Sequence, residues 1–325
     1  MEQIIKLIQN HTNFVVASHI NPDGDAIGSC YGLAFALEKL GKNVITALEP
    51  YPKKYNILPG RKFLHTKPLE EILDVEVLIA LDCSDAGRLG SAQPLFNRAT
   101  HTVCIDHHKS NTGFAEYNFI EPNASSTSEL VFRLIEKLVT PCINIATAIY
   151  AGILDDTGGF KYSSTTKSTM EIAARLMDMG IPFSEIYNEV RHSHSFAANK
   201  AKGIALKNAR QTPDKRIIYS YITRRGLSAA GANASSDMDG IVEYLLTTEG
   251  AETAAFAYER QGEGCKISLR SKGPDVGAVA EAMGGGGHRL AAGCSSSHSA
   301  KEALEQILDL LKKEIEVYDR CHQCI

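Results

Sequence analysis

The chain has 325 residues, of which 44% are hydrophobic and 22% are charged, so it is long enough to bury the cores of two ordinary globular domains. Its formal net charge of -4 excludes a protein whose whole surface attracts nucleic acid, and any polyanion must be met locally, by metal ions or a small basic cluster. The apolar stretches are shorter than a membrane span and residues 1–10 do not resemble a secretory signal, so we expect a cytoplasmic protein without a membrane segment.

The first part of the chain alternates short apolar runs with helical patterns. Strands are expected over residues 14–18, 44–48, 75–81 and 102–105. Helices are expected over residues 26–40, 128–139, 143–154 and 166–179. Near-continuous apolar strands separated by helices are typical of a parallel sheet with helices on both faces. We therefore predict an α/β domain over residues 1–190.

The second part of the chain forms a smaller unit in this interpretation. Residues 191–200 are polar and have no strand pattern, which predicts a linker. Strands are expected over residues 216–222, 254–258 and 266–269, and helices over residues 241–247 and 300–316. We therefore predict a second α/β domain over residues 201–325.

The eight cysteines are scattered, and most lie within apolar runs, so we expect reduced, buried thiols and no disulfide framework. Only Cys321 and Cys324 lie close together, with His322 between them. Because two thiols at a chain end make a weak zinc site, a frayed tail is the favoured interpretation of this segment.

The first chemical motif follows the strand at residues 14–18. His19, Asp23 and Asp25 lie in one loop whose Pro22 and Gly24 allow a tight turn. Ligands of open parallel sheets bind beyond the carboxyl ends of the strands, so this loop is well placed for a site. A turn whose carboxylates cap the next helix explains the same residues.

Two further motifs follow predicted strands. Asp82 stands at the end of one strand, where a single aspartate is common in ordinary turns. Asp106, His107 and His108 end another strand and place a carboxylate and two imidazoles at the same edge of the sheet. A hydrogen-bonded pair of surface histidines is the alternative interpretation of the second group.

The fourth motif ends the predicted helix 143–154. Asp155 and Asp156 lie where the helix dipole disfavours negative charge, so they need compensation. A bound cation supplies it in one interpretation, and solvation of an acidic helix end supplies it in the other.

Taken together, the four motifs predict a centre with two metal ions, since two divalent cations need about six to eight protein ligands. The candidate ligands are His19, Asp23, Asp25, Asp82, His107 and Asp156. Carboxylates and imidazoles without thiolates suit Mn²⁺, Mg²⁺ or Co²⁺ better than structural zinc.

The four motifs, in this order, resemble those of the DHH phosphoesterase superfamily. The distal Gly284–Gly287 run, followed by His288, is similar to the nucleotide-binding carboxy-terminal (DHHA1) domain of that superfamily. The resemblance spans nearly the whole chain and is greatest to the nanoRNase group. It implies an amino-terminal catalytic domain joined to a smaller substrate-binding domain.

The resemblance also implies roles for individual residues. One Mn²⁺ would be held by His19, Asp23 and Asp82, and the other by Asp25, Asp82, His107 and Asp156. Asp106 would orient His107, and His108 would face the substrate, to stabilise the phosphoryl oxygens or to protonate the leaving group. The family commonly has an uncharged residue where Asp155 stands, so a spectator role and an effect on the charge of the site both remain open for this residue.

The implied activity is hydrolysis of phosphate esters by a hydroxide held between two metal ions, without a covalent enzyme intermediate. Expected substrates are short oligonucleotides, linear dinucleotides and 3′-phosphoadenosine 5′-phosphate. The expected substrate contacts are Arg88, Arg270, Gly286, Gly287 and His288. Hydrolysis of pyrophosphate or polyphosphate and non-catalytic nucleotide sensing are the alternatives, and a homodimer remains open.

Overall fold

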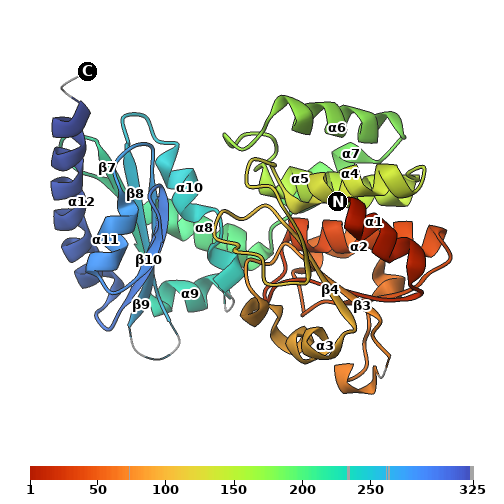
Figure 1. Cartoon of the computed structure of the whole chain (residues 1–325). Coiled ribbons are helices and arrows are strands. Elements are labelled where there is room, and N and C mark those ends of the chain that lie inside the picture. The colour runs from red at the N-terminus through yellow and green to blue at the C-terminus, as the bar shows by residue number, and fades with distance from the viewer. Residues whose placement is uncertain (73, 233–234, 261, 263, 323–325) are drawn as a thin grey trace. The chain divides into compact units, whose positions relative to one another are not determined.

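The computed structural model describes residues 1–325 except 73, 233–234, 261, 263 and 323–325. The chain divides into two compact units, Met1–Ser193 and His194–Ile325 (Figure 1). Each unit contains one sheet with helices packed on it. Among the described residues, no helix is both long and apolar enough to cross a membrane.

The first unit is built on a five-stranded sheet in the order β2-β1-β3-β4-β5, in which every neighbouring pair is parallel. The strands are β1 (Asn13–Ala17), β2 (Asn43–Ala47), β3 (Val77–Leu81), β4 (His101–Asp106) and β5 (Tyr117–Ile120). The predicted parallel sheet is confirmed. The sequence pattern did not indicate β5, a short edge strand whose residues are only partly buried or exposed.

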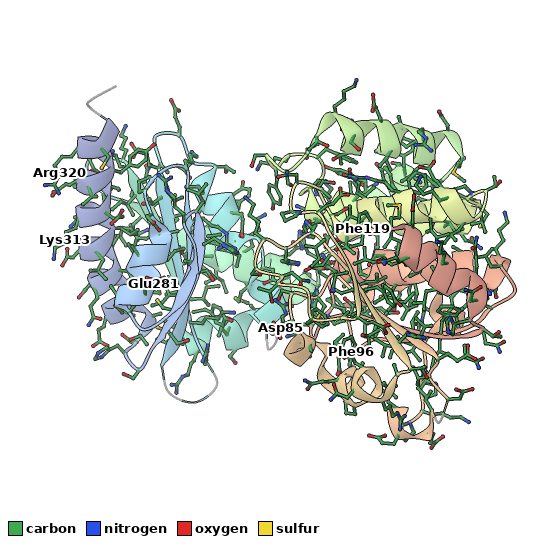
Figure 2. The ribbon with its side chains drawn as sticks, in the orientation of Figure 1. Asp85, Phe96, Phe119, Glu281, Lys313 and Arg320 are labelled. Atoms are coloured by element: carbon green, nitrogen blue, oxygen red, sulfur yellow. The ribbon has the colours of Figure 1, made fainter. Side chains whose placement is uncertain are left out.

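Two hydrophobic cores cover the two faces of this sheet, because successive strand residues point to opposite sides. Phe14 and Val16 belong to the larger core, and Val15 and Ala17 belong to the smaller one. The helices of the larger core include α1 (Glu2–Asn10), α2 (Gly24–Lys39), α4 (Thr127–Leu138), α5 (Ile143–Asp156), α6 (Lys167–Asp178) and α7 (Phe183–His192). The smaller core lies under the 3₁₀ segment η4 (Ala86–Ala92) and α3 (Gln93–Arg98), whose Phe96 is labelled in Figure 2.

Helices α2 and α5 cross at very close range. A Cβ atom built on Gly28 of α2 would lie 2.5 Å from the carbonyl oxygen of Ala148 in α5, so only glycine fits at this position. The close crossing holds the first turn of α2 near the last turn of α5, and both turns carry predicted site residues.

The second unit has a six-stranded mixed sheet in the order β10-β11-β9-β8-β7-β6, in which only β7 and β8 pair in parallel. The strands are β6 (Arg210–Gln211), β7 (Ile217–Ile222), β8 (Thr253–Glu259), β9 (Cys265–Ser271), β10 (Gly286–His288) and β11 (Ala291–Ser296). One face carries α11 (Val276–Ala282) and α12 (Ala300–His322), from which Lys313 and Arg320 point away from the sheet (Figure 2). The other face carries α8 (Phe196–Asn208) and α10 (Ile241–Leu246), and α9 (Arg224–Ala230) packs beside α8.

Two segments differ from simple expectations. The predicted linker 191–200 contains the end of α7 and the beginning of α8, which leaves residues 193–195 between the two helices. The frayed tail was expected to include Cys321, but this residue lies in α12; Cys324 is outside the described residues. The described cysteines are free thiols, as expected, and Cys321 is exposed.

Candidate functional site

Three of the four sequence motifs meet at one edge of the parallel sheet in the first unit. His19 follows β1, Asp82 follows β3, and His107 follows β4, and these three strands are neighbours in the sheet. Asp156 reaches the same place from the end of α5. The structure therefore brings together residues that are more than 130 positions apart in the sequence because parallel strands end at a common edge.

Asp82 lies at the centre of this group. Its Oδ2 atom is 3.5 Å from Nε2 of His19, and its Oδ1 atom is 3.6 Å from Nε2 of His107. The hydroxyl of Thr127 donates to Oδ1 at 3.1 Å, which fixes the plane of the carboxylate. Asp82 itself has φ 54°, a left-handed conformation that costs energy in a residue other than glycine and often marks a functional position. One carboxylate thus faces two imidazoles through different oxygens.

His19 presents its Nε2 atom to the carboxylates of the group. Its Nδ1 atom lies 2.7 Å from the carbonyl oxygen of Ile20, and since a carbonyl only accepts, Nδ1 carries the proton. Nε2 is then the ring nitrogen that can bind a metal ion, and it lies 3.9 Å from Oδ1 of Asp23. Asp23 is also the N-cap of α2, where it accepts from the amides of Asp25 and Ala26 at 3.1 Å. The capping interpretation of this motif is therefore correct and compatible with a site.

Asp25 is buried and held by the first turn of α4. Its two oxygens accept from the amides of Thr127 at 2.6 Å and Ser128 at 2.8 Å. Burial raises the pKa of Asp25 well above its ordinary value, and the charges of Asp82 and Asp156 raise it further.

Asp156 completes the group on the side of His107. Its Oδ2 atom lies 3.3 Å from Nε2 of His107. Burial raises the pKa of Asp156 to about 8, and the neighbouring charges of Asp82 and Asp23 add to the effect. Carboxylates that raise one another's pKa in this way are stabilised by a cation between them.

The ligand atoms gather in three overlapping sets. Within each set the atoms lie within 4.8 Å of one another, and the sets are His19, Asp23 and Asp82; Asp25, His107 and Asp156; and Asp82, His107 and His108. Of the two ligand groups that the resemblance implied, the first set has the members of one, and the second has those of the other except Asp82. The donors are oxygens and imidazole nitrogens, which fit divalent cations such as Mn²⁺ or Mg²⁺.

Comparison with known proteins identifies two domain families along the chain. The sequence model described as "DHH family, N-terminal domain" matches residues 13–153, and that of the DHHA1 domain matches residues 214–317. The bifunctional oligoribonuclease and PAP phosphatase NrnA of Thermus thermophilus is 30% identical over 304 residues, which cover 92% of this chain and 89% of that protein. The chain belongs to the DHH family.

Two further matches, one in sequence and one to a solved structure, cover almost the whole chain. The bifunctional oligoribonuclease and PAP phosphatase NrnA of Bacillus subtilis is 27% identical over 321 residues, or 95% of this chain and 96% of that protein. A crystal structure of an exopolyphosphatase-related protein from Bacteroides fragilis superposes with a TM-score of 0.89 at 28% identity, covering 98% of this chain and 97% of that one. The division into a DHH and a DHHA1 domain therefore extends to a solved structure.

The DHH sequence at residues 106–108 is arranged differently from our expectation. We expected Asp106 to orient the ring of His107, but its Oδ1 atom instead accepts from Nδ1 of His108 at 2.7 Å. Asp106 also accepts from the backbone amide of His107 at 2.9 Å and, through Oδ2, from the side-chain amide of Asn111 at 2.7 Å. The ring of His107 has its Nδ1 atom 3.4 Å from the carbonyl oxygen of Ala124. The expectation failed because adjacent residues at a strand end point to different sides.

His108 is the most exposed member of the DHH sequence, with 38% of its side chain accessible. Its hydrogen bond to Asp106 raises its pKa to about 9 despite partial burial, and the charge of Asp82 contributes. Nδ1 of His108 is engaged by Asp106, so Nε2 is the ring atom left to meet a substrate.

Arg88 lies beside the first motif. Its carbonyl oxygen accepts from the amide of Ile20 at 2.8 Å, so the backbone of η4 adjoins the loop that carries His19. The side chain of Arg88 is half-buried. Its contact with substrate remains a prediction.

The remaining predicted contacts lie in the DHHA1 unit. Arg270 of β9 pairs with Glu243 of α10 at 2.8 Å, and Ala291 of β11 lies opposite both Arg270 and His288 in the sheet. Residues 286–288 of the glycine-rich run form strand β10. Gly287 has φ 147°, and a Cβ atom there would lie 2.5 Å from Cα of Ala292, so the close pairing of β10 with β11 requires glycine.

Sequence reasoning missed three residues that support the site: Thr127, Asn111 and Tyr55. Thr127 had a local signal, since Ser126 and Glu129 have the spacing of a helix start just before an apolar run. Asn111 and Tyr55 had no such local signal, because only the folded structure brings them to the site.

Proposed function

We propose that the protein is a metal-dependent phosphoesterase that hydrolyses short oligonucleotides, including linear dinucleotides, and 3′-phosphoadenosine 5′-phosphate. The observation that carries the proposal is Asp82, whose two oxygens face the Nε2 atoms of His19 and His107 at 3.5 and 3.6 Å. A carboxylate in this position can bridge two cations. The names of the two NrnA relatives, which are oligoribonucleases and PAP phosphatases, support the substrate class.

The proposed ligands of one cation are His19, Asp23 and Asp82, and those of the other are Asp25, Asp82, His107 and Asp156. Mn²⁺ is the proposed metal, with Mg²⁺ or Co²⁺ as substitutes, because these ions accept mixed oxygen and imidazole donors. The raised pKa values of Asp25 and Asp156 support the assignment, since burial and the neighbouring carboxylates disfavour their charged forms unless a cation is bound nearby. When bound, the two ions supply charge neutralisation for a phosphoryl group and lower the pKa of water.

The side chains of the chain itself position the substrate and move protons. Asp106 holds Nδ1 of His108, so that Nε2 of His108 can donate a proton to the oxygen of the leaving group. Thr127 holds the carboxylate of Asp82, and the amides of Thr127 and Ser128 hold that of Asp25. These contacts keep the ligand atoms in place before any substrate binds.

In the same proposal, the DHH unit carries catalysis and the DHHA1 unit carries substrate recognition. Arg270 and His288 are the proposed contacts with a phosphate, and Gly286 and Gly287 let backbone amides approach it closely. Arg88 is the proposed contact from the DHH unit. A cytoplasmic location and a homodimer belong to the proposal as well.

The experiment that tests the function is a substrate panel with added Mn²⁺. The panel contains 5′-labelled RNAs of increasing length from a dinucleotide, 3′-phosphoadenosine 5′-phosphate, and pyrophosphate. We expect turnover of the dinucleotide and the bisphosphate, with rates that fall steeply as the RNA lengthens. Preference for pyrophosphate, or tight nucleotide binding without turnover, would reject the proposal in favour of a pyrophosphatase or a nucleotide sensor.

A further inference from the structure

Asp155 directly precedes the proposed ligand Asp156, but its carboxylate contacts different groups. Its Oδ2 atom accepts from the backbone amide of Gly24 at 2.9 Å and from the hydroxyl of Tyr55 at 2.8 Å. Its Oδ1 atom lies 3.5 Å from Nη1 of Arg191. Among the described residues, the clusters of ligand atoms include Asp156 and do not include Asp155. The two neighbouring carboxylates therefore have different partners.

The contact with Gly24 acts on the loop of the proposed metal ligands. Gly24 is the first residue of α2 and lies between Asp23 and Asp25. The first amides of a helix have no acceptor within the helix, and the side chain of Asp23 accepts from those of Asp25 and Ala26. Asp155 supplies the acceptor for the amide of Gly24. This bond ties the end of α5 to the turn that presents two ligands.

The fit between the two residues is close. A Cβ atom on Gly24 would lie 2.5 Å from Cβ of Asp155 and 2.7 Å from its Oδ2 atom, so the carboxyl group fills the space above this glycine. Only 13% of the Asp155 side chain is exposed. Its negative charge, unfavourable at a helix C-terminus, is balanced by donors from three other segments.

Two of these donors hold the carboxylate in place. Tyr55 belongs to the 3₁₀ segment η1 (Lys53–Ile57) and is buried, and its burial beside Asp155 raises the pKa of its hydroxyl, which therefore remains a donor. Arg191 comes from the last turn of α7. Four segments of the DHH unit thus meet at one carboxylate.

We infer that Asp155 is a positioning residue that holds the amide of Gly24 and so fixes the turn in which Asp23 and Asp25 meet the metal ions. The inference rests on the proposed function for the roles of Asp23 and Asp25. It assigns Asp155 a hydrogen-bonding role that is separate from ligation by Asp156.

A pair of substitutions separates this role from a simple effect of charge. Asp155→Ala removes the acceptor, whereas Asp155→Asn can place its amide oxygen at the position of Oδ2 and accept both bonds without a charge. We expect the Gly24 amide in Asp155→Ala to exchange with solvent at least about tenfold faster, measured by NMR on the metal-free protein. Its affinity for Mn²⁺, measured by calorimetry, should fall about 10- to 100-fold. Asp155→Asn should stay within about threefold of the original protein in both measurements.

Asp178→Ala is the matched control, because Asp178 is an exposed aspartate that ends helix α6 of the same unit. It should change neither measurement. Excess Mn²⁺ should restore kcat of Asp155→Ala, since a displaced turn weakens metal binding and leaves the reacting groups intact. Tyr55→Phe provides a milder variant that keeps the Gly24 bond, and we expect exchange of that amide to rise severalfold.

Unchanged exchange at Gly24 in Asp155→Ala would overturn the inference, as would equal losses of Mn²⁺ affinity in Asp155→Asn and Asp155→Ala. If Asp155→Ala fails to fold, Asp155→Asn and Tyr55→Phe decide the matter through the same amide. Failure of the proposed function is distinguishable, because the original protein would then bind no Mn²⁺ or hydrolyse no nucleotide while the exchange test still reports on the Gly24 bond.

Discussion

Nδ1 of His108 lies 2.7 Å from Oδ1 of Asp106, a carboxylate with no exposed surface. Asn111 and the amide of His107 occupy further positions on the same carboxylate. Asp106 therefore holds the ring of His108 through Nδ1, which leaves Nε2 as the ring nitrogen that can meet a substrate. This arrangement gives the proposed proton donor a role separate from metal ligation, although Nδ1 of His108 also lies 3.6 Å from Oδ1 of Asp82.

Asp106→Asn tests this separation. An asparagine cannot stabilise a charged His108 in the same way, so we expect kcat on a dinucleotide to fall about 100-fold or more, the size of a lost general acid. The affinity for Mn²⁺ should change by less than about tenfold, because Asp106 is outside the three ligand sets. Steady-state kinetics measures kcat and calorimetry measures the affinity for Mn²⁺, and Asp178→Asn is the control. Equal losses of turnover and metal affinity would contradict the separation.

Asp82 offers a test of the bridging position. With φ 54°, residue 82 tolerates asparagine better than alanine, so Asp82→Asn should fold while it loses one charged oxygen. We expect turnover to fall at least about 1,000-fold and the Mn²⁺ stoichiometry to fall below two, because one carboxylate serves both ions. Activity assays and metal analysis measure these changes, and a thermal melt confirms folding. Manganese-dependent turnover close to that of the original protein would refute the assignment.

The sequence predicted the convergence of these groups because the carboxyl ends of parallel strands share an edge. His19, Asp82 and His107 each follow an apolar run that was recognisable as a strand, and their strands are neighbours. The near-continuous apolar run of β1 also predicted that both faces of the sheet are covered. Local sequence patterns were therefore enough to predict that these residues meet at one edge of the sheet.

The partners of individual side chains could not be predicted in the same way. Asp155 and Asp156 are identical and adjacent, and only the rotation of the last turn of α5 sends one to Tyr55 and the other to His107. Tyr55 is 100 positions from Asp155, so no local pattern relates them. The carboxylate of Asp106 likewise contacts His108 and Asn111 and not the ring of His107.

Glu129 gives a prediction about stability. This buried carboxylate accepts from Arg133 at 2.6 Å, from the hydroxyl of Ser125 at 2.8 Å, and from the hydroxyls of Ser168 and Thr169 at 2.9 Å. Glu129→Ala would remove this shared acceptor from all four donors, of which Arg133 keeps its pair with Glu121, so we expect the free energy of unfolding to fall by about 3–5 kcal/mol. Urea denaturation measures it.

The matched control for that prediction is Lys167→Gln, which removes a pair with Glu171 in which both side chains are well exposed. It should cost less than about 1 kcal/mol. A loss of similar size in both variants would show that the network around Glu129 contributes no more than a surface ion pair.

Removal of the metal should make stability depend on pH through the clustered carboxylates. Burial and the neighbouring charges raise the pKa of Asp156 to about 8 and that of Asp25 well above its ordinary value. The folded metal-free protein therefore keeps protons that the unfolded chain releases above about pH 4, so its stability falls as the pH rises from there toward about 8. Bound Mn²⁺ replaces those protons and removes the penalty.

We expect the rise in Tm on adding Mn²⁺ to protein treated with chelator to be clearly larger at about pH 8.5 than at about pH 6. In Asp156→Asn the difference between the two pH values should shrink, because one of the raised groups is gone. A Tm increment that is the same at both pH values in the original protein would show that these carboxylates do not bind the ion.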